Sequence, residues 1–341
     1  MFEQLSFLRQ KDLGFDKEQV VAIHPQGNLL VDRFRNAIGS HPNVLQISST
    51  APSIGPDRGF GMVGMKGPDG KSISTYQYIV DYDYLKTMGI QLSEGRTFSR
   101  DYGEDATSSV IVNKALVREM EWDDPIGQSL PNSKYTVIGV VEDYNYRSLH
   151  YPVDPVMLKI DPSWISWVLV KIRPDDIAGS VALLEQTWTE FVPNLPFEYY
   201  FLDEDIDRFY RTEQRFSVIA TYASLFAIGI ACLGIFGLTM ITVSRRIREI
   251  GIRKIMGAGI AHILRLISGE YVLLVVIANL LAWPLAYYAI QRWLAEFAYR
   301  IDLGVTPFII GGFLALTVAL GTVAFHAVRA AQANPVETLR E

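Results

Sequence analysis

An uncharged stretch of 27 residues constrains the fold of this chain more than any other feature. It runs from Ser217 to Val243 and reads SVIATYASLFAIGIACLGIFGLTMITV. About 20 apolar residues are enough to cross the hydrocarbon core of a bilayer, and buried helices of soluble proteins rarely run so long without a charge. Tyr271–Ile290 and Phe308–Val328 are two further uncharged stretches. We therefore expect three transmembrane helices, near 217–243, 271–290 and 308–328.

The balance of charges changes sign where the apolar part begins. Residues 1–210 hold 19 Lys and Arg against 30 Asp and Glu, whereas residues 211–341 hold 12 against 7. This shift predicts a water-exposed domain over 1–210 and a membrane domain over 211–341. The net charge of −6 argues against a partner nucleic acid. The single cysteine, Cys232, excludes a disulfide framework and a cysteine-cluster metal site.

The distribution of basic residues predicts the orientation in the membrane. The connection 244–270 carries six Lys and Arg residues, whereas 291–307 carries two. Short loops rich in Lys and Arg stay in the cytoplasm, so we expect 244–270 and the C-terminal tail inside and residues 1–210 and 291–307 outside. The first residues, MFEQLSFLRQKDLGF, have no apolar core for a signal peptide. We therefore expect a further membrane helix upstream of this chain.

Residues 1–210 alternate between strand-like and helix-like segments. Strands are predicted at Val20–Ile23, Val44–Ser49, Ile73–Val80, Ser109–Val112, Tyr135–Val141, Trp167–Ile172 and Phe197–Leu202. Helices are predicted at 28–39, Tyr82–Met88, Asn113–Glu121 and Ile177–Phe191. We expect Asp203 to cap a last helix that continues through Arg215 into the first membrane stretch.

No segment carries the motif of an enzyme. Gly64–Ser72 ends in Gly-Lys-Ser like a phosphate-binding loop, but Met65 stands where the first glycine is needed. The five histidines have no metal-ligand spacing, and no G-x-S-x-G nucleophile motif is present. The sequence therefore predicts no catalytic residue, no cofactor-binding residue and no metal ligand, and the chain is expected not to be an enzyme.

The segment Ser244–Ala258, SRRIREIGIRKIMGA, combines basic residues with isoleucines directly after the first apolar stretch. We expect this segment to be a basic helical extension of the first apolar stretch, which ends at Gly257, Ala258 and Gly259. A second amphipathic segment is expected to follow at Ile260–Ile267. A patch of this kind can hold lipid headgroups. Its apolar residues among the charges are also suited to dock a cytoplasmic protein, so both interpretations remain open at this point.

The amino-acid sequence of this segment resembles the signature of the FtsX/MacB-like ABC transporter permeases. The similar string runs from Arg246 to Ala258, and the C-terminal Asn334–Arg340 resembles the closing motif of the same family. Strings similar to its MacB-like periplasmic core occur in family order at Tyr84–Ile90, Glu94–Phe98, Val112–Lys114, Asp124–Gly127 and Val137–Asp143.

This resemblance implies a fold, a location and partners. It implies an α+β extracytoplasmic domain, with a porter-like α/β part and an inserted mostly-β part near 55–150, followed by an all-α membrane domain of three transmembrane helices. The protein is expected to be a multi-pass protein of the bacterial plasma (inner) membrane, in contact with membrane lipid. A separate cytoplasmic ABC ATPase is expected to bind the ATP. Other expected partners are a second permease half or a homodimer partner, and a periplasmic adaptor or an envelope enzyme.

Two sets of residues are predicted, one from this resemblance and one from the spacing of small residues in the apolar stretches. Residues expected to couple the chain to the ATPase lie in the 244–270 loop: Arg245, Arg246, Arg248, Glu249, Gly251, Arg253, Lys254, Gly257 and Ala258. Small residues at helical spacing let membrane helices approach closely. Residues expected to pack helices in this way are Ala223, Ala227, Ala231, Gly311, Ala315 and Ala319.

Two functions follow from these expectations. The first is export or extrusion of an amphipathic substrate, such as a peptide, a lipopeptide or a lipoprotein, driven by the ATPase. The alternative is an FtsX-type mechanotransmission protein that transports nothing and regulates a cell-envelope enzyme. In both, closure of the ATPase moves the outer domain through the first membrane helix, since packed helices shift as rigid units.

Overall fold

The computed structural model describes residues 2–24, 28–55, 61–131, 133–191, 193–246, 249, 252–253, 256–257 and 259–332. The chain forms two compact units. The first, which we call the outer domain, comprises Phe2–Glu213 together with Phe297–Tyr299. The second, which we call the helical unit, comprises Gln214–Glu296 and the residues from Arg300 onward.

The outer domain is built on one ten-stranded sheet with the strand order β10-β1-β9-β2-β4-β8-β6-β7-β5, and β3 pairs with β4 beside this path. Its strands are β1 (Val20–Ile23), β2 (Val44–Ala51), β3 (Gly61–Lys66), β4 (Ser72–Val80), β5 (Leu92–Gly95), β6 (Ser109–Asn113), β7 (Thr136–Val141), β8 (Val156–Ile160), β9 (Trp167–Ile172) and β10 (Tyr199–Phe201). The pairs β4–β8 and β6–β7 are parallel, and the other named pairs are antiparallel.

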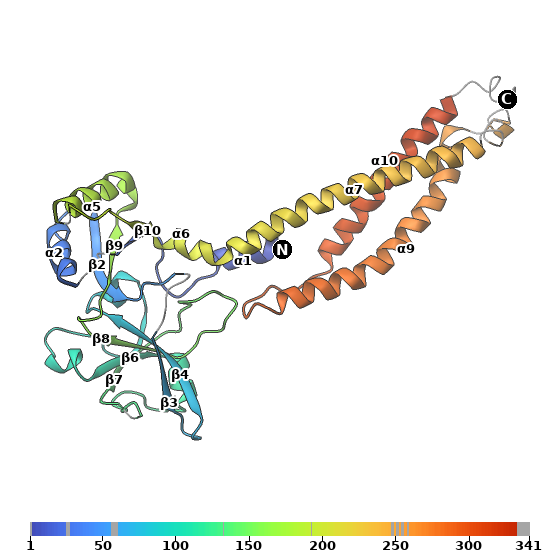
Figure 1. Cartoon of the computed structure of the whole chain (residues 1–341). Helices are drawn as coiled ribbons and strands as arrows, with labels where there is room; N and C mark the ends of the chain where they lie inside the picture. Colours follow the sequence, from blue (N-terminus) through green and yellow to red (C-terminus); the bar gives the residue numbers. More distant parts are fainter. Residues whose placement is uncertain are drawn as a thin grey trace. The chain divides into compact units, whose positions relative to one another are not determined.

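Short helices accompany this sheet. They are α1 (Phe2–Gln10), α2 (Asn28–Ile38), α3 (Tyr84–Thr87), α4 (Lys114–Glu119), α5 (Ile177–Phe191) and α6 (Leu202–Asp207), with 3-10 turns η1 (Gly103–Ala106), η2 (Pro174–Asp176) and η3 (Arg208–Tyr210). Figure 1 shows α2 and α5 next to one another beside β2 and β9.

The outer domain has two hydrophobic clusters. In the first, Phe34 of α2 and Trp188 of α5 pack edge to face, with ring centroids 5.8 Å apart, over the apolar residues of β1, β2 and β9. In the second, Leu116 and Met120, in and after α4, pack on β6, β7 and the ends of β3, β4 and β8. The outer domain is therefore a mixed α/β domain with two hydrophobic clusters on one sheet, and the predicted insertion near 55–150 stays a prediction.

Among the residues that the structure describes, three long helices follow: α7 (Arg211–Arg245), α9 (Ile260–Leu294) and α10 (Thr306–Gln332). Each contains a segment long and apolar enough to cross a membrane, namely Leu202–Thr242, Ser268–Leu294 and Thr306–Phe325. These segments overlap the three predicted spans. α9 passes through Pro284.

The structure differs from the prediction at the start of α6 and at the start of α9. The residue that precedes α6 is Phe201, which makes no side-chain capping bond, so the predicted cap at Asp203 is wrong. Asp203 lies inside the helix and accepts only from the amide of Glu204. The predicted continuity is confirmed, because helical residues run from Leu202 through α6, η3 and α7 to Arg245. Ile260–Ile267 is not a separate piece but the first turns of α9.

Candidate functional site

The connection between α7 and α9 holds the predicted coupling residues. Arg245 is the last residue of α7 and is exposed. Arg246 follows it, and its Nη2 lies 2.8 Å from Oε1 of Glu270 in α9. Close by, the hydroxyl of Tyr271 lies 3.5 Å from Oγ1 of Thr242. The ion pair and this contact tie the end of α7 to α9, which the sequence pattern did not predict because Glu270 is distant along the chain.

The described residues in the middle of the connection include both charged and apolar side chains. Glu249 and Arg253, four residues apart in the sequence, form an ion pair with 2.6 Å between Oε1 and Nη2. Ile252 and Met256 are 53% and 82% exposed, and the amide of Met256 donates to the carbonyl of Ile252. Exposed apolar side chains beside charges are a feature of protein docking surfaces. This arrangement adds Ile252 and Met256 to the residues predicted from the sequence.

The connection ends in a glycine turn. Gly257 has a φ of +91°, a conformation that non-glycine residues adopt only at a cost. The helix α9 then begins after Gly259, without a side-chain capping bond. The predicted coupling residues Arg248, Gly251, Lys254 and Ala258 and the C-terminal motif Asn334–Arg340 lie outside the described residues. The coupling role of the whole set stays a prediction.

The predicted helix-packing residues fall into two groups. Ala223 and Ala227 lie on an exposed face of α7. Ala231 and the three small residues of α10 line an apolar cavity of about 430 Å³ between α7, α9 and α10. Those three residues are Gly311, Ala315 and Ala319. Asn279 of α9 is a polar side chain in this lining, and its Nδ2 donates to the carbonyl of Val275 at 2.9 Å.

The close approach of α9 and α10 occurs at a glycine that the sequence prediction did not include. A Cβ at Gly312 would lie 3.1 Å from Cζ2 of Trp283, whereas a Cβ at the neighbouring Gly311 would meet no atom within 4 Å. The two adjacent glycines therefore differ in packing although they are indistinguishable in the sequence pattern.

We expect Gly312→Leu to lower the stability of the helical unit by about 1–3 kcal/mol, because the added side chain overpacks the contact with Trp283. The measurement is the thermal unfolding midpoint of the full chain in detergent, followed by Trp fluorescence. Gly311→Leu is the matched control, since it adds the same side chain one residue away where space is open. Equal losses in both variants would contradict this assignment of the contact.

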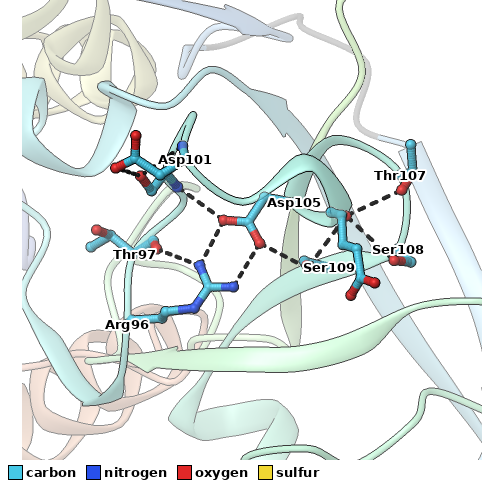
Figure 2. A network of polar contacts seen from close by, with 9 residues as sticks. Arg96, Thr97, Asp101, Asp105, Thr107, Ser108 and Ser109 are labelled. Atoms are coloured by element: carbon cyan, nitrogen blue, oxygen red, sulfur yellow. Dashed lines mark hydrogen bonds and ion pairs between the residues drawn. The ribbon is translucent and has the colours of Figure 1, made fainter.

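In the outer domain, Arg96 of the Glu94–Phe98 string forms an ion pair with the buried carboxylate of Asp105, which Figure 2 shows. Arg96 donates through Nη1 and Nη2 to the two carboxylate oxygens of Asp105, at 2.6 and 2.7 Å. The Asp105 carboxylate is fully buried and also accepts from the amide of Ser99 and the hydroxyl of Ser109. Burial alone would raise the pKa of Asp105, but these four hydrogen bonds outweigh it and hold the pKa below its ordinary value.

The strings Val112–Lys114 and Val137–Asp143 meet at the start of α4. The buried side chain of Asn113 accepts from the amide of Leu116 as the helix cap and from the amide of Val156, and it donates to the carbonyl of Asp154. Asp143 accepts from the amide of Ala115 at 2.8 Å. These family-like residues therefore fix the backbone of the outer domain around the start of α4.

Within the described ranges, no group of three or more His, Cys, Asp and Glu side chains is placed to hold a metal ion. Gly64–Ser72, which resembles a phosphate-binding loop in sequence, is a hairpin of β3 and β4 closed by the bond from the Gly67 amide to the Lys71 carbonyl. The hairpin lacks the helix that follows the glycine-rich loop in a nucleotide site.

Two models of known protein families match this chain, one in each of its parts. The model of the MacB-like periplasmic core domain matches residues 8–184, and the model of the FtsX-like permease C-terminal region matches residues 221–335. The macrolide export ATP-binding/permease protein MacB of Sodalis glossinidius is 28% identical over 280 residues, which are 76% of this chain and 42% of that protein. The MacB of Aggregatibacter actinomycetemcomitans is 25% identical over 70% of this chain and 39% of that protein.

The chain thus spans less than half the length of these curated relatives. Among solved structures, the periplasmic region of MacB from Actinobacillus actinomycetemcomitans aligns at 17% identity and a TM-score of 0.39, covering 57% of this chain and 94% of that one. The extracellular domain of the ABC-type transporter YknZ aligns at 13% identity and a TM-score of 0.38, covering 58% of this chain and 93% of that one.

Proposed function

Because the chain belongs to the family of the MacB-like periplasmic core domain, joined to an FtsX-like permease region, we propose that it is the membrane subunit of an ABC export or extrusion complex. In this proposal, the chain itself catalyses no reaction. A cytoplasmic ABC ATPase closes on ATP and pushes the α7–α9 connection, and the helical unit carries that movement to the outer domain. The protein is a multi-pass protein of the inner membrane with a periplasmic-type domain.

The observation that carries this proposal is the surface of the α7–α9 connection. It combines the exposed Arg245 with the apolar Ile252 and Met256, and it ends in the turn at Gly257. Basic residues alone are enough to hold lipid headgroups, and exposed apolar residues beside charges are also found at protein docking surfaces. The apolar residues support a protein partner, for which we propose the ATPase.

The substrate is proposed to be amphipathic, such as a peptide, a lipopeptide or a lipoprotein. No described charged residue lies between Ser217 and Val243 or between Tyr271 and Ile290, so the spans offer no chain of ionisable groups for a proton relay. This supports a mechanical cycle driven by ATP. We propose that two permease halves, either a homodimer or a pair of related chains, form the complex.

The experiment uses the full chain, reconstituted in proteoliposomes with the ABC ATPase encoded beside it. We expect the ATPase rate to rise severalfold when an amphipathic lipopeptide is added. A rise only when a purified cell-wall hydrolase is added would support the FtsX-type regulator instead. No association between the chain and the ATPase would contradict both functions.

A further inference from the structure

The strand β3 (Gly61–Lys66) lies beside β4 at an edge of the outer-domain sheet (Figure 1). Among the strands that the structure describes, β3 pairs only with β4, in one unbroken register from Gly61 opposite Gln77 to Lys66 opposite Ser72. An edge strand presents a row of N–H and C=O groups that can pair with a further strand. Within the described part of the chain, the second side of β3 is therefore open to a partner.

The other two edges of the sheet are better protected than β3. Proteins protect edge strands by keeping them short or by adding bulges, charges or proline. At the two ends of the sheet, β10 has three residues, and β5 has four residues, a shift in register and the acidic Glu94. β3 has six residues, and its one charged residue is Lys66 at the last position. Because Met62 and Val63 are also 58% and 38% exposed, this edge is suited to pairing with another strand.

The backbone groups of β3 point alternately toward β4 and toward the open side. The amide of Gly67, directly after β3, donates to the carbonyl of Lys71 across the hairpin. Successive residues of an antiparallel pair alternate between hydrogen-bonded and non-hydrogen-bonded positions. Met62 and Gly64 therefore direct their N–H and C=O groups to the open side, whereas those of Val63 point toward β4. A further strand can bond to Met62 and Gly64 without disturbing the pairing with β4.

The two glycines of β3 are not required by their surroundings within the described residues. Neither Gly61 nor Gly64 has a positive φ. A Cβ at these positions would lie 3.6 Å and 3.5 Å from its nearest neighbour, which is an ordinary contact distance. Glycine inside a strand weakens the strand, and it often marks a place where another backbone approaches closely. A second strand at this edge would explain both glycines.

The order of large and small residues in β3 fits a second copy of the same strand. When two copies run antiparallel about a two-fold axis at Val63, this residue lies opposite Val63 of the partner subunit. Met62 then lies opposite Gly64 of the partner subunit, so a methionine faces a glycine on each side of the axis. Lys66 and Lys66 of the partner subunit are about 20 Å apart along the strands, well beyond the range of strong repulsion. The strand is therefore complementary to itself in shape and in charge.

We propose that β3 pairs with β3 of a second copy of this chain, which joins the two outer-domain sheets into one continuous sheet. The self-complementary order of glycine and methionine favours a second copy over an unrelated peptide. Two identical surfaces related by a two-fold axis close at two copies. The pairing rests on the proposed function, in which two permease halves assemble, and it identifies the halves as two copies of this chain that meet at β3.

Disulfide crosslinking of the full chain in proteoliposomes tests this pairing. In a Cys232→Ser background, Val63→Cys places one cysteine opposite its counterpart in the second copy. Opposite residues at a non-hydrogen-bonded position have Cβ atoms about 4.5–5.5 Å apart, close to the separation in a disulfide. Oxidation with copper phenanthroline should therefore convert more than about half of the chains to a dimer on a non-reducing gel.

Leu92→Cys is the matched control for random collisions. Leu92 is 37% exposed, close to the value for Val63, but it lies on the short and irregular edge strand β5. It should give at least about fivefold less dimer, because a protected edge does not pair. A mixture of Met62→Cys and Gly64→Cys chains tests the register. These two positions lie opposite one another in the proposed pair, so the mixture should crosslink better than either variant alone.

Gly64→Pro separates pairing from folding. It removes an N–H that points to the open side, and an edge strand tolerates proline where that group does not bond within the sheet. In the Val63→Cys chain, it should lower the dimer yield at least about fivefold and leave the thermal unfolding midpoint near that of the parent. Gly64→Lys is a second variant that keeps the backbone N–H, and it should also lower the yield because a lysine on an edge strand blocks pairing.

A dimer yield for Val63→Cys no higher than for Leu92→Cys would overturn the pairing. Crosslinking of Val63→Cys mainly to another protein in cell membranes would overturn it as well. Failure of the proposed function gives a different result: if the chain binds no ATPase but Val63→Cys crosslinks as expected, the pairing stands as a contact between two copies. If the ATPase binds and no crosslink forms, the proposed function stands and the pairing is wrong.

Discussion

Arg253→Glu is expected to weaken binding of the proposed ABC ATPase partner at least about tenfold, because it places a negative charge in the basic α7–α9 connection that we propose as the docking surface, and like-charge contacts at an interface cost several kcal/mol. Arg253 lies between the exposed Ile252 and the turn that contains Gly257. The measurement is the dissociation constant of the purified ATPase for the full chain in nanodiscs, together with the ATPase rate of the complex.

The substitution also breaks the internal pair with Glu249, so a matched control is needed. The exchange variant Glu249→Arg/Arg253→Glu restores an ion pair of reversed direction within the connection. We expect the exchange to leave binding weak if Arg253 contacts the ATPase. Full recovery of binding would mean that the internal pair, and not contact with the partner, explains the loss, and it would contradict the coupling role of Arg253.

Arg96→Ala is expected to destabilise the outer domain by about 3 kcal/mol, because it leaves the buried carboxylate of Asp105 without its charged partner. The Arg96 side chain is 38% exposed, so water that replaces it would keep the loss near the lower end of the range for buried pairs. Chemical denaturation of the full chain, followed by Trp fluorescence, measures the free energy of unfolding.

The pH dependence gives an independent check on this pair. Because hydrogen bonds depress the pKa of Asp105 in the folded protein, the stability from the pair is fully present above the ordinary pKa of an aspartate. It is lost as the pH falls through the depressed value. In Arg96→Ala, the free energy of unfolding should therefore decrease less steeply than in the parent chain as the pH is lowered from about 5. An unchanged acid profile would contradict the assignment. Arg96→Lys, which keeps the charge but lacks the planar fork of the guanidinium, should fall in between.

Local periodicity predicted much of the fold, for physical reasons that particular segments show. β1 and β9 match the predicted bounds because short apolar runs rich in β-branched residues are typical of buried strands and are shorter than most helices. α5 matches because acidic residues and a proline mark its start. β3 (GMVGMK) was missed, because its glycines indicate a turn when read alone, and only pairing with β4 makes it a strand.

The contacts that organise the sites could not be predicted in the same way. Asp105, the partner of Arg96, is nine residues away in the sequence. The ring of Phe297 stacks on His150, which is much more distant along the chain. Nothing in hydrophobic periodicity encodes such pairs. The same holds for Gly311 and Gly312, where the helix face decides which glycine is close to α9. Patterns predict which elements form, whereas tertiary contacts decide which side chains meet.

The central claim is that movement enters the chain at the α7–α9 connection and reaches the outer domain. The most direct measurement is the distance between spin labels at Trp164→Cys in the outer domain and Met256→Cys in the connection, in a Cys232→Ser background. Trp164 and Met256 are 68% and 82% exposed and suited to labelling. With the ATPase bound, addition of ATP is predicted to shift the distance distribution, and Arg253→Glu is predicted to abolish that shift. A distribution that ATP leaves unchanged in the parent complex would contradict the account.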